Sequence, residues 1–330
     1  MPSELQQVLE GYGIRGIRLQ LVTDNPRKPV WRIRSPQGEF YLKRMAVSPG
    51  RLRFILAAME HLERGGVRLP PVVPTVTGEP YLALGNQLYL LTRAVAGQDL
   101  DYGTHLPLIV RSLARFHRAG RGFAPPPEAE VHSHLGRWPE HYRKKLEELD
   151  HFRARAASTP NPDAFCRIFL REVPFFRQQI EATLARLADG RYDAWVEKLR
   201  AEGCLSHQDY AASNLRLVDG EVLVFDLDSV TCDLPARDLR KLFNKVMKKG
   251  QWDSTLVRRI LGLYQEVYPL TADERQVVAT DVMFPHLFCG AVNKYFTGRA
   301  ADWPPEKLVG KLQEAIRSDR QKLRTLSAFR

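Results

Sequence analysis

The sequence of 330 residues is poor in cysteine, with four, and no two of them stand in C-x-x-C spacing. This pattern fits a cytosolic protein whose thiols stay reduced, with each cysteine packed among apolar side chains. No apolar run reaches the length of a membrane span. The first residues show neither the basic stretch nor the apolar stretch of a secretory signal. We therefore expect a cytoplasmic protein with no membrane partner.

Acidic residues are the scarcer charged type, with 38 Asp and Glu against 49 Lys and Arg, which gives a net charge of +11. A basic excess is common in proteins that bind nucleic acid. Here the basic residues are spread along the chain, and no continuous basic arm occurs. The charge therefore argues against nucleic acid as the main partner. It suits ATP, a phosphorylated substrate or an acidic surface assembly.

One polar loop and the strand after it carry the chemistry. Residues 207–214 read H-x-D-x-x-x-x-N and place Asp209 five residues before Asn214. An Asp-Gly pair follows, which supplies the positive φ that a tight hairpin turn needs. The predicted hairpin has arms at residues 215–218 and 222–225, and it ends in a D-x-D motif that begins at Asp226. Such a hairpin would bring Asp209, Asn214 and Asp226 close together.

These residue types fit phosphoryl transfer from ATP. The reaction needs a group that meets the incoming hydroxyl, and it needs Mg²⁺ on the phosphates, held by hard oxygen ligands. Asp209 would orient and deprotonate the hydroxyl, while Asn214 and Asp226 would hold the metal. The order of the three residues is that of the kinase catalytic loop and the hairpin after it. The alternative is a polar loop, a turn and a buried strand with capping aspartates.

The segment resembles the aminoglycoside phosphotransferase and choline kinase superfamily, whose loop reads H-G-D-x-x-x-x-N, and more closely the bacterial spore coat protein S family within it. The resemblance is strongest in residues 226–241, DLDSVTCDLPARDLRK, and 113–123, LARFHRAGRGF, and it extends from about Gly38 to about Leu312. It implies a two-lobed protein kinase-like fold of the α+β class. The small N-terminal lobe would be an antiparallel β structure and the large C-terminal lobe mainly helical.

We predict the N-terminal nucleotide-binding lobe at residues 1–91, the hinge at 92–97 and the catalytic and acceptor-binding lobe at 98–330. Strands are expected at residues 17–23, 30–34 and 40–43, followed by a helix at 49–64. Lys43 ends the third strand, where kinases keep the lysine that binds the α- and β-phosphates. Its alternative role is that of an ordinary edge-strand lysine. Adenine would bond to the backbone around Thr92 to Ala94.

Three features depart from the pattern of active kinases. The first hairpin turn lacks a glycine-rich loop to cover the phosphates. Tyr41 shares the strand face of Lys43, where kinases usually keep a small residue over adenine. In the helix that normally presents a glutamate to the lysine, Ile55 stands near the expected position. Glu60 is the nearer alternative, although it also fits a solvated helix face.

The C-terminal part is predicted to be helical at residues 106–119, 140–157, 162–187, 192–201, 238–249, 255–268, 272–295 and 305–323. Pro174 is expected to break or kink the third of these helices, and Pro285 to kink the seventh. Asp238 is predicted to cap its helix and support the polar loop. His117 is predicted to be a packed helix residue. Polar candidates for the acceptor side, in the region where the resemblance places it, are His286, Asn293, Lys294 and Arg299.

The resemblance implies an ATP- and Mg²⁺-dependent phosphotransferase that acts on a small hydroxylated substrate and works at the spore coat. Other spore coat proteins would be partners, and the protein would be made in the mother-cell cytoplasm. The alternative is a pseudokinase that serves as a structural or assembly component of the coat, which the three departures favour. The acceptor stays open between a sugar, an amino alcohol and a protein side chain.

Overall fold

The computed structural model describes residues 3–23, 25–247 and 251–330. The chain forms two compact units, and each is assembled from three segments. The first, here called the β unit, comprises Met1–His105, Phe123–His132 and Ala212–Val230. The second, the helical unit, comprises Leu106–Gly122, Ser133–Ala211 and Thr231–Arg330. The sequence-based lobe boundaries stay a prediction, and the hairpin that follows Asn214 belongs to the β unit in this division.

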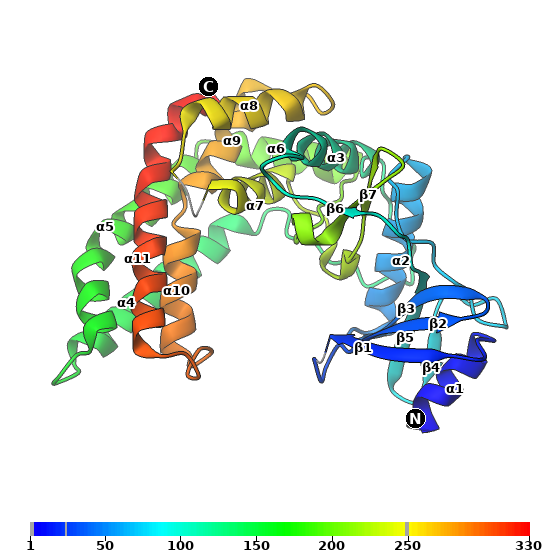
Figure 1. The fold of residues 1–330 in the computed structure, drawn as a ribbon. Helices are drawn as coiled ribbons and strands as arrows, with labels where there is room; N and C mark the ends of the chain where they lie inside the picture. The colour runs from blue at the N-terminus through cyan, green and yellow to red at the C-terminus, as the bar shows by residue number, and fades with distance from the viewer. Residues whose placement is uncertain (1–2, 24, 248–250) are drawn as a thin grey trace. The chain divides into compact units, whose positions relative to one another are not determined.

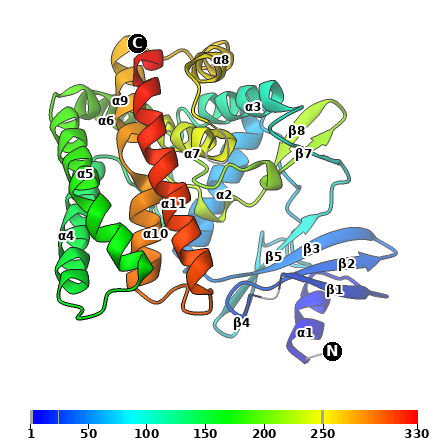
Figure 2. The same cartoon turned by 60° about the vertical axis from the view of Figure 1, so that its left-hand side comes forward.

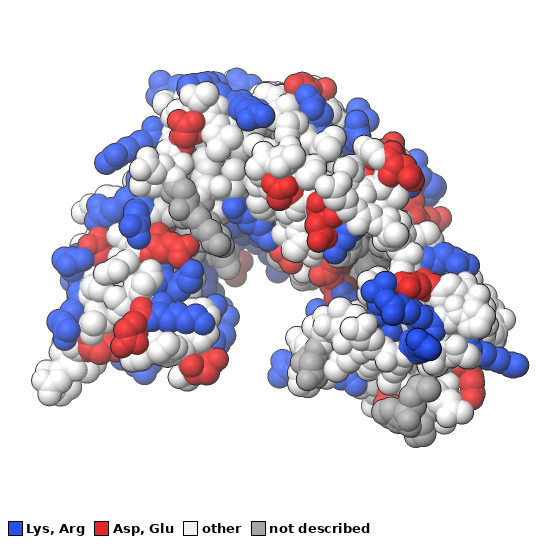
Figure 3. Space-filling view, viewed as in Figure 1, with Lys and Arg blue, Asp and Glu red and all other residues white. Residues whose placement is uncertain are grey.

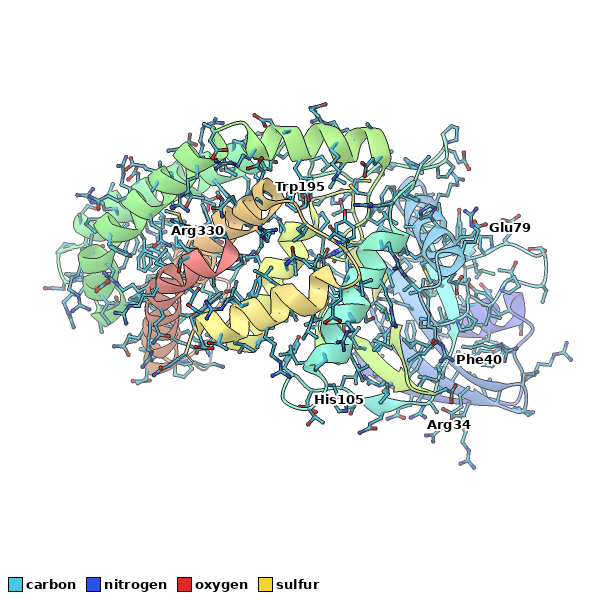
Figure 4. The ribbon with its side chains drawn as sticks, turned by 90° about the horizontal axis from the view of Figure 1, so that it is seen from above. Arg34, Phe40, Glu79, His105, Trp195 and Arg330 are labelled. Carbon is cyan, nitrogen blue, oxygen red and sulfur yellow. The ribbon has the colours of Figure 1, made fainter. Side chains whose placement is uncertain are left out.

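An antiparallel five-stranded sheet forms most of the β unit, in the order β1-β2-β3-β5-β4 (Figure 1). Its strands are β1 Arg18–Thr23, β2 Val30–Ser35, β3 Gly38–Met45, β4 Leu82–Leu84 and β5 Gln87–Arg93. Helix α1, Ser3–Gly11, covers one face, because its stripe of Leu5, Val8 and Leu9 packs against apolar side chains of the sheet. Phe40 of β3, which Figure 4 labels, is buried in this cluster. The three strands predicted at residues 17–23, 30–34 and 40–43 are confirmed and pair antiparallel in chain order.

Helix α2, Pro49–Arg64, follows the sheet and has the bounds that the sequence predicts. The side chain of Ser48 accepts a hydrogen bond from the backbone N–H of Arg51, which caps the helix, and Pro49 occupies the first turn. Both are standard helix-start signals. Gly65 ends the helix. This local chemistry explains why the prediction succeeds here.

A second sheet in the β unit carries the predicted hairpin. Its order is β6-β7-β8, with β6 Gln98–Asp99, β7 Leu215–Val218 and β8 Glu221–Val224. Asp219 and Gly220 in the turn have φ values of 52° and 79°, as a two-residue hairpin turn requires. A Cβ atom on Gly97 would lie 2.7 Å from the carbonyl oxygen of Leu217, so only glycine permits this approach. The short strand β6, which the sequence did not predict, thereby pairs with β7.

The helical unit is an assembly of α helices (Figures 1 and 2). They are α3 Leu106–Ala119, α4 Trp138–Ala157, α5 Ala164–Leu187, α6 Arg191–Glu202, α7 Pro235–Met247, α8 Ser254–Gln265, α9 Ala272–Met283, α10 His286–Phe296 and α11 Pro305–Gln321. Short 3-10 turns occur at Ala212–Asn214, Leu227–Ser229 and Lys322–Phe329, the first two within the β unit. Helix α4 packs on α5, and α10 packs on α11. Stacked rings of Phe176 and Phe288, 4.0 Å between centroids, join α5 to α10.

Two helix predictions are corrected, and a third is contradicted in part. Helix α5 continues through Pro174 without a break, because the buried side chains of Phe169, Val173 and Phe176 hold it on both sides of the proline. A kink at Pro174 stays a prediction. Pro285 separates two helices instead of kinking one, since the preceding residue is extended, with ψ of 133°. Helix α7 begins at Pro235, so Asp238 lies in its first turn and is not its cap. The last residues predicted for that helix, 248–249, lie outside the described residues.

Within the described residues, no helix is long and apolar enough to cross a membrane. On the face shown in Figure 3, Lys and Arg side chains are interspersed with Asp and Glu. The basic excess thus forms no single continuous patch on that face.

Candidate active site

A cavity of about 410 Å³ in the β unit collects most of the predicted nucleotide and metal residues. Lys43 of β3, Thr92 of β5, Asn214 of the 3-10 turn and Asp226 after β8 all line it. The hairpin β7–β8 accounts for this meeting, because it returns the chain from Asn214 to Asp226. The backbone N–H of Phe225 donates to the carbonyl of Asn214 at 3.1 Å, which closes the base of the hairpin.

The amino group of Lys43 lies between two carboxylates. Its Nζ is 2.5 Å from Oδ1 of Asp226 and 2.7 Å from Oδ1 of Asp228. Burial opposes the charge on Lys43, but Asp228 and Asp226 outweigh burial and raise the pKa of the lysine. The lysine therefore stays charged at neutral pH and is not a solvated edge-strand residue, with 21% of its side chain exposed. Asp228, the second residue of the D-x-D motif, was not assigned a role from sequence.

Asp226 and Gln208 have left-handed backbone conformations, with φ of 63° and 67°. Apart from the turn residue Asp219, no other non-glycine residue in the described part of the chain has positive φ. Such backbones cost free energy and persist where neighbouring contacts fix them, often at functional sites. Gln208 stands where the superfamily motif has glycine. A side chain at this position makes the left-handed backbone less favourable than it is with glycine.

Helix α2 presents no glutamate to Lys43. Ile55 and Met59 line the cavity instead, and Glu60 is exposed and pairs with Arg64 at 3.9 Å. The prediction that Glu60 lies on a solvated face is confirmed. Arg51, one turn before Ile55, donates from Nη2 to the carbonyls of Asp228, at 3.0 Å, and Val230. The helix thus fixes the segment after the D-x-D motif by hydrogen bonds to its backbone.

The turn between β1 and β2 supplies a lysine where kinases have glycines. Lys28 Nζ lies 3.5 Å from Oδ2 of Asp228. Thr23 and Val30, on either side of this turn, line the cavity together with Tyr41. The turn therefore brings a positive charge beside the carboxylates, a feature that the absence of glycine alone did not reveal.

Of the two residues predicted in the hinge segment, Thr92 lines the cavity and Ala94 does not. Thr92 pairs with Tyr41 across the sheet. The N–H of Ala94 donates to the carbonyl of Glu39 at 2.9 Å, and Val95, not Ala94, lines the cavity. The N–H of Ala94 is thus engaged within the sheet, and the adenine contact expected around Thr92 to Ala94 stays a prediction.

The loop that carries Asp209 lies in the helical unit and is held by a buried carboxylate. Oδ2 of Asp238 accepts from the N–H of His207 at 2.7 Å, and Oδ1 accepts from the N–H of Gln208 at 2.9 Å. Burial would raise the pKa of Asp238, but His117, bonded to it at 3.1 Å, lowers the pKa to about 2. Asp238 thus supports the loop as predicted, and His117 is the packed helix residue that was expected.

Asp209 itself is half exposed, and its Oδ1 lies 3.4 Å from Nζ of Lys245. Its neighbour Gln208 is fixed from a second side, because Lys241 donates to the carbonyl and to the side-chain oxygen of Gln208. Burial lowers the pKa of Lys241 to about 8. The loop backbone around Asp209 is therefore set within the helical unit before any ligand binds.

The four polar candidates for the acceptor side are occupied in other contacts. His286 bonds to the buried carboxylate of Asp281 at 2.9 Å, and burial lowers the pKa of His286 well below its usual value. Asn293 donates to Glu148 at 3.2 Å and accepts from Arg299. Lys294 lies over the ring of Trp303, 4.7 Å from its centroid. These contacts support packing of α10.

Comparison with known proteins finds relatives over most of the chain. The family model described as "Spore coat putative kinase YutH" matches residues 41–329. Spore coat protein S of Bacillus subtilis (strain 168) is 31% identical over 321 residues, which is 96% of this chain and 91% of that protein. The endospore coat-associated protein YutH of the same organism is 24% identical over 225 residues, 67% of this chain and 63% of that protein.

Solved structures show the same fold. An aminoglycoside phosphotransferase from Alicyclobacillus acidocaldarius superposes with a TM-score of 0.80 at 20% identity, covering 98% of this chain and 94% of that chain. A microcompartment-associated aminopropanol kinase superposes with a TM-score of 0.63 at 14% identity, covering 99% and 98%. The fold is therefore the predicted kinase-like α+β fold. With a family model that spans most of its length and 31% identity to spore coat protein S, the chain belongs to the spore coat family of kinase-like proteins.

Proposed function

We propose that this protein is an ATP- and Mg²⁺-dependent phosphotransferase that transfers phosphate to the hydroxyl group of a small acceptor. The observation that carries the proposal is the cavity of the β unit, where Lys43, Asp226, Asp228 and Asn214 meet. A lysine beside carboxylates and an amide is the combination that phosphoryl transfer needs, a cation for phosphate and hard oxygens for a metal.

The donor set fits Mg²⁺. Asp226 and Asp228 offer carboxylate oxygens and Asn214 offers an amide oxygen, while Mg²⁺ in kinases completes its shell with phosphate oxygens and water. Among the described residues, no cluster of three or more His, Cys, Asp or Glu is suited to a metal. A nucleotide-dependent site does not need such a cluster. When bound, Mg²⁺ would neutralise charge on the phosphates.

Each residue then has a distinct task. Lys43 would exchange its carboxylate partners for phosphate oxygens, and Lys28 would add a second cation from the β1–β2 turn. Thr92 and Val95 line the part of the cavity where adenine would bond to the backbone. Asp209, on its rigid loop, would orient the acceptor hydroxyl and take its proton. The likeness to spore coat protein S supports synthesis in the mother-cell cytoplasm and association with other proteins of the spore coat.

The test is calorimetry of ATP binding with and without Mg²⁺, on the wild type and on Asp226→Asn. We expect binding that Mg²⁺ strengthens, and loss of the Mg²⁺-dependent part in the variant. Asp219→Asn is the matched control, because Asp219 lies on the same hairpin and also has positive φ. If the wild type binds no ATP at millimolar concentration with Mg²⁺, the proposal fails.

A pseudokinase that assembles into the coat is the second candidate. The specific observation in its favour is α2, where Ile55 and Met59 line the cavity and no glutamate faces Lys43. Under this alternative the coat location persists when Asp226 is replaced. A fluorescent fusion of Asp226→Asn that reaches the coat like the wild type, in a protein that binds no ATP, would favour the structural role.

A further inference from the structure

A second cavity, of about 610 Å³, lies wholly within the helical unit at the start of α4. It is here called the cationic cavity. It is lined by charged side chains of the loop before α4, of α4 itself and of the first turn of α7, namely His134, Arg137, Glu140, His141, Arg143, Lys144, Glu147 and Arg237. None of the residues proposed to bind nucleotide or metal or to take the proton lines it.

Positive charge dominates the lining, with four Arg and Lys side chains against two Glu. Arg137, Arg143 and Lys144 are exposed, and none of them forms an ion pair within 4.0 Å in the described part of the chain. By contrast, Lys43 in the β-unit cavity lies beside two carboxylates. The lining thus offers charge that no protein group neutralises at close range.

Arg237 is the fixed member of the set. Its Nε donates to Oδ2 of the buried Asp233 at 3.2 Å, and its guanidinium lies over the ring of Trp138, 5.0 Å from the centroid. Its side chain is 12% exposed and lines the cavity wall. Burial opposes its charge, but the carboxylates of Asp233 and Asp281 outweigh burial and raise the pKa of Arg237. Arginine held in this way is suited to phosphate and carboxylate groups.

The pKa of His141 also shows the effect of the positive charges around this cavity. Partial burial lowers the pKa of His141, and the charges of Arg237 and Lys145 lower it further. Glu148 acts in the opposite direction and does not reverse the effect. A neutral imidazole beside several cations adds a hydrogen-bonding group without adding to their repulsion.

A short chain of contacts joins the cationic cavity to the loop of Asp209. Oδ2 of Asp233, which holds Arg237, also accepts from Nε2 of Gln208 at 3.1 Å. Oδ1 of Asp233 accepts from Nε1 of Trp138 at 3.0 Å. Gln208 directly precedes Asp209, so a ligand group held by Arg237 would lie near the loop that meets the acceptor.

We propose that the cationic cavity binds a phosphate or carboxylate group of the acceptor, so that the acceptor is an anionic hydroxyl compound and not a cationic amino sugar. The identification of the ligand as an acceptor rests on the proposed function. The anion site itself does not require phosphate transfer. A cationic ligand would meet the unpaired charges of Arg143 and Lys144, whereas an anionic one would neutralise them.

The test uses calorimetry without nucleotide, with inorganic phosphate, a hexose phosphate, the parent neutral hexose and a cationic amino sugar as probes. We expect the wild type to bind the two phosphates and neither of the others at millimolar concentration. Arg143→Glu is expected to weaken hexose phosphate binding by about tenfold or more, since one charge-assisted contact has roughly that effect.

Arg153→Glu is the matched control, because Arg153 is an exposed arginine on the same helix and does not line the cavity. It is expected to leave the affinity within about twofold. The inference is overturned if the phosphates do not bind, if both variants behave alike, or if the amino sugar binds more tightly than the hexose phosphate.

ATP binding, measured on the same preparations, separates the two proposals. Binding of ATP without binding of hexose phosphate removes the anionic acceptor and leaves the kinase. Binding of hexose phosphate without ATP removes the kinase and leaves an anion site in the helical unit.

Discussion

In the β unit the amino group of Lys43 lies against two carboxylates, whereas in the helical unit Arg143 and Lys144 line a cavity without an ion-pair partner among the described residues. In the first arrangement the protein's own carboxylates neutralise the lysine, and a nucleotide bound there would have to displace them. The second presents its charges directly to a ligand. Binding of nucleotide is therefore expected to rearrange ion pairs in the β unit, while the loop of Asp209 keeps the conformation that Asp238 gives it.

The largest effect is expected on the rate of phosphate transfer when Asp209, which lies in the helical unit, is replaced. Asp209→Asn keeps the shape of the side chain and removes its charge. Transfer is expected to fall by roughly 10²–10⁴-fold, as for loss of a general base, or about 3–5 kcal/mol of barrier. ATP affinity is expected to change little, because the nucleotide residues lie in the β unit. Product detection and calorimetry measure the two quantities. Transfer at the wild-type rate would remove Asp209 from the mechanism.

Asp238→Ala tests whether Asp238 holds the loop of Asp209 in one conformation, as the contrast between the two units assumes. The change removes a buried carboxylate that accepts from two loop amides and from His117. A loss of about 3–5 kcal/mol in the free energy of unfolding is expected, measured with urea. Asp273→Ala is the control, since Asp273 is exposed and its ion pair with Arg191 is expected to contribute less than about 1 kcal/mol. Equal losses in both variants would show that Asp238 does not hold the loop.

The low pKa of Asp238 predicts how acid affects the helical unit. Its folded pKa of about 2 lies below the usual value of 3.8, so the native state favours the ionised form. The stabilisation is complete above about pH 4 and is lost as the pH falls toward 2, amounting to about 2 kcal/mol. Urea unfolding at several pH values from 5 downward measures it. The wild type is expected to lose more stability over this range than Asp238→Asn, and parallel curves would contradict the assignment.

The smallest effect is expected at the rim of the β-unit cavity. Lys28→Ala removes a half-exposed charge beside Asp228 and is expected to weaken binding of ATP with Mg²⁺ by about twofold to fivefold, the size of a partly screened contact. The difference is expected to shrink at high salt. Arg27→Ala, at the exposed neighbouring position, is the control. A larger loss in the control would mean that general charge, and not Lys28, acts on the nucleotide.

Local signals in the sequence predicted much of this structure. Helix α2 has a Ser cap and a first-turn proline, and the hairpin has its Asp-Gly turn, so both were found with their bounds or nearly so. Asn214 and Asp226 followed from motif spacing, and Lys43 from its place between a strand and a helix, where kinases keep a lysine. The structure brings all three to one cavity. Their roles stay predictions.

The remainder depended on contacts between distant segments. Pro174 stays inside α5 because tertiary packing outweighs the lost hydrogen bond, which no local pattern reveals. Arg51 reads as part of a helix surface in the sequence, yet it bonds to the backbone at Asp228 and Val230. Lys28 and Asp228 meet only because the β1–β2 turn folds beside the hairpin. The cationic cavity likewise joins residues from α4 with Arg237, which is far along the chain.

The pairing of Lys43 with Asp226 spans 183 residues, and this separation bears on the order in which the protein is made. The first sheet leaves the ribosome early, but the hairpin that completes the β unit is synthesised only after α3 to α6. At about 5–20 residues per second, the lysine waits roughly 10–40 s for its carboxylates. During that time the nascent β unit lacks the ion pairs of Lys43, so the cavity around this lysine is completed late in synthesis.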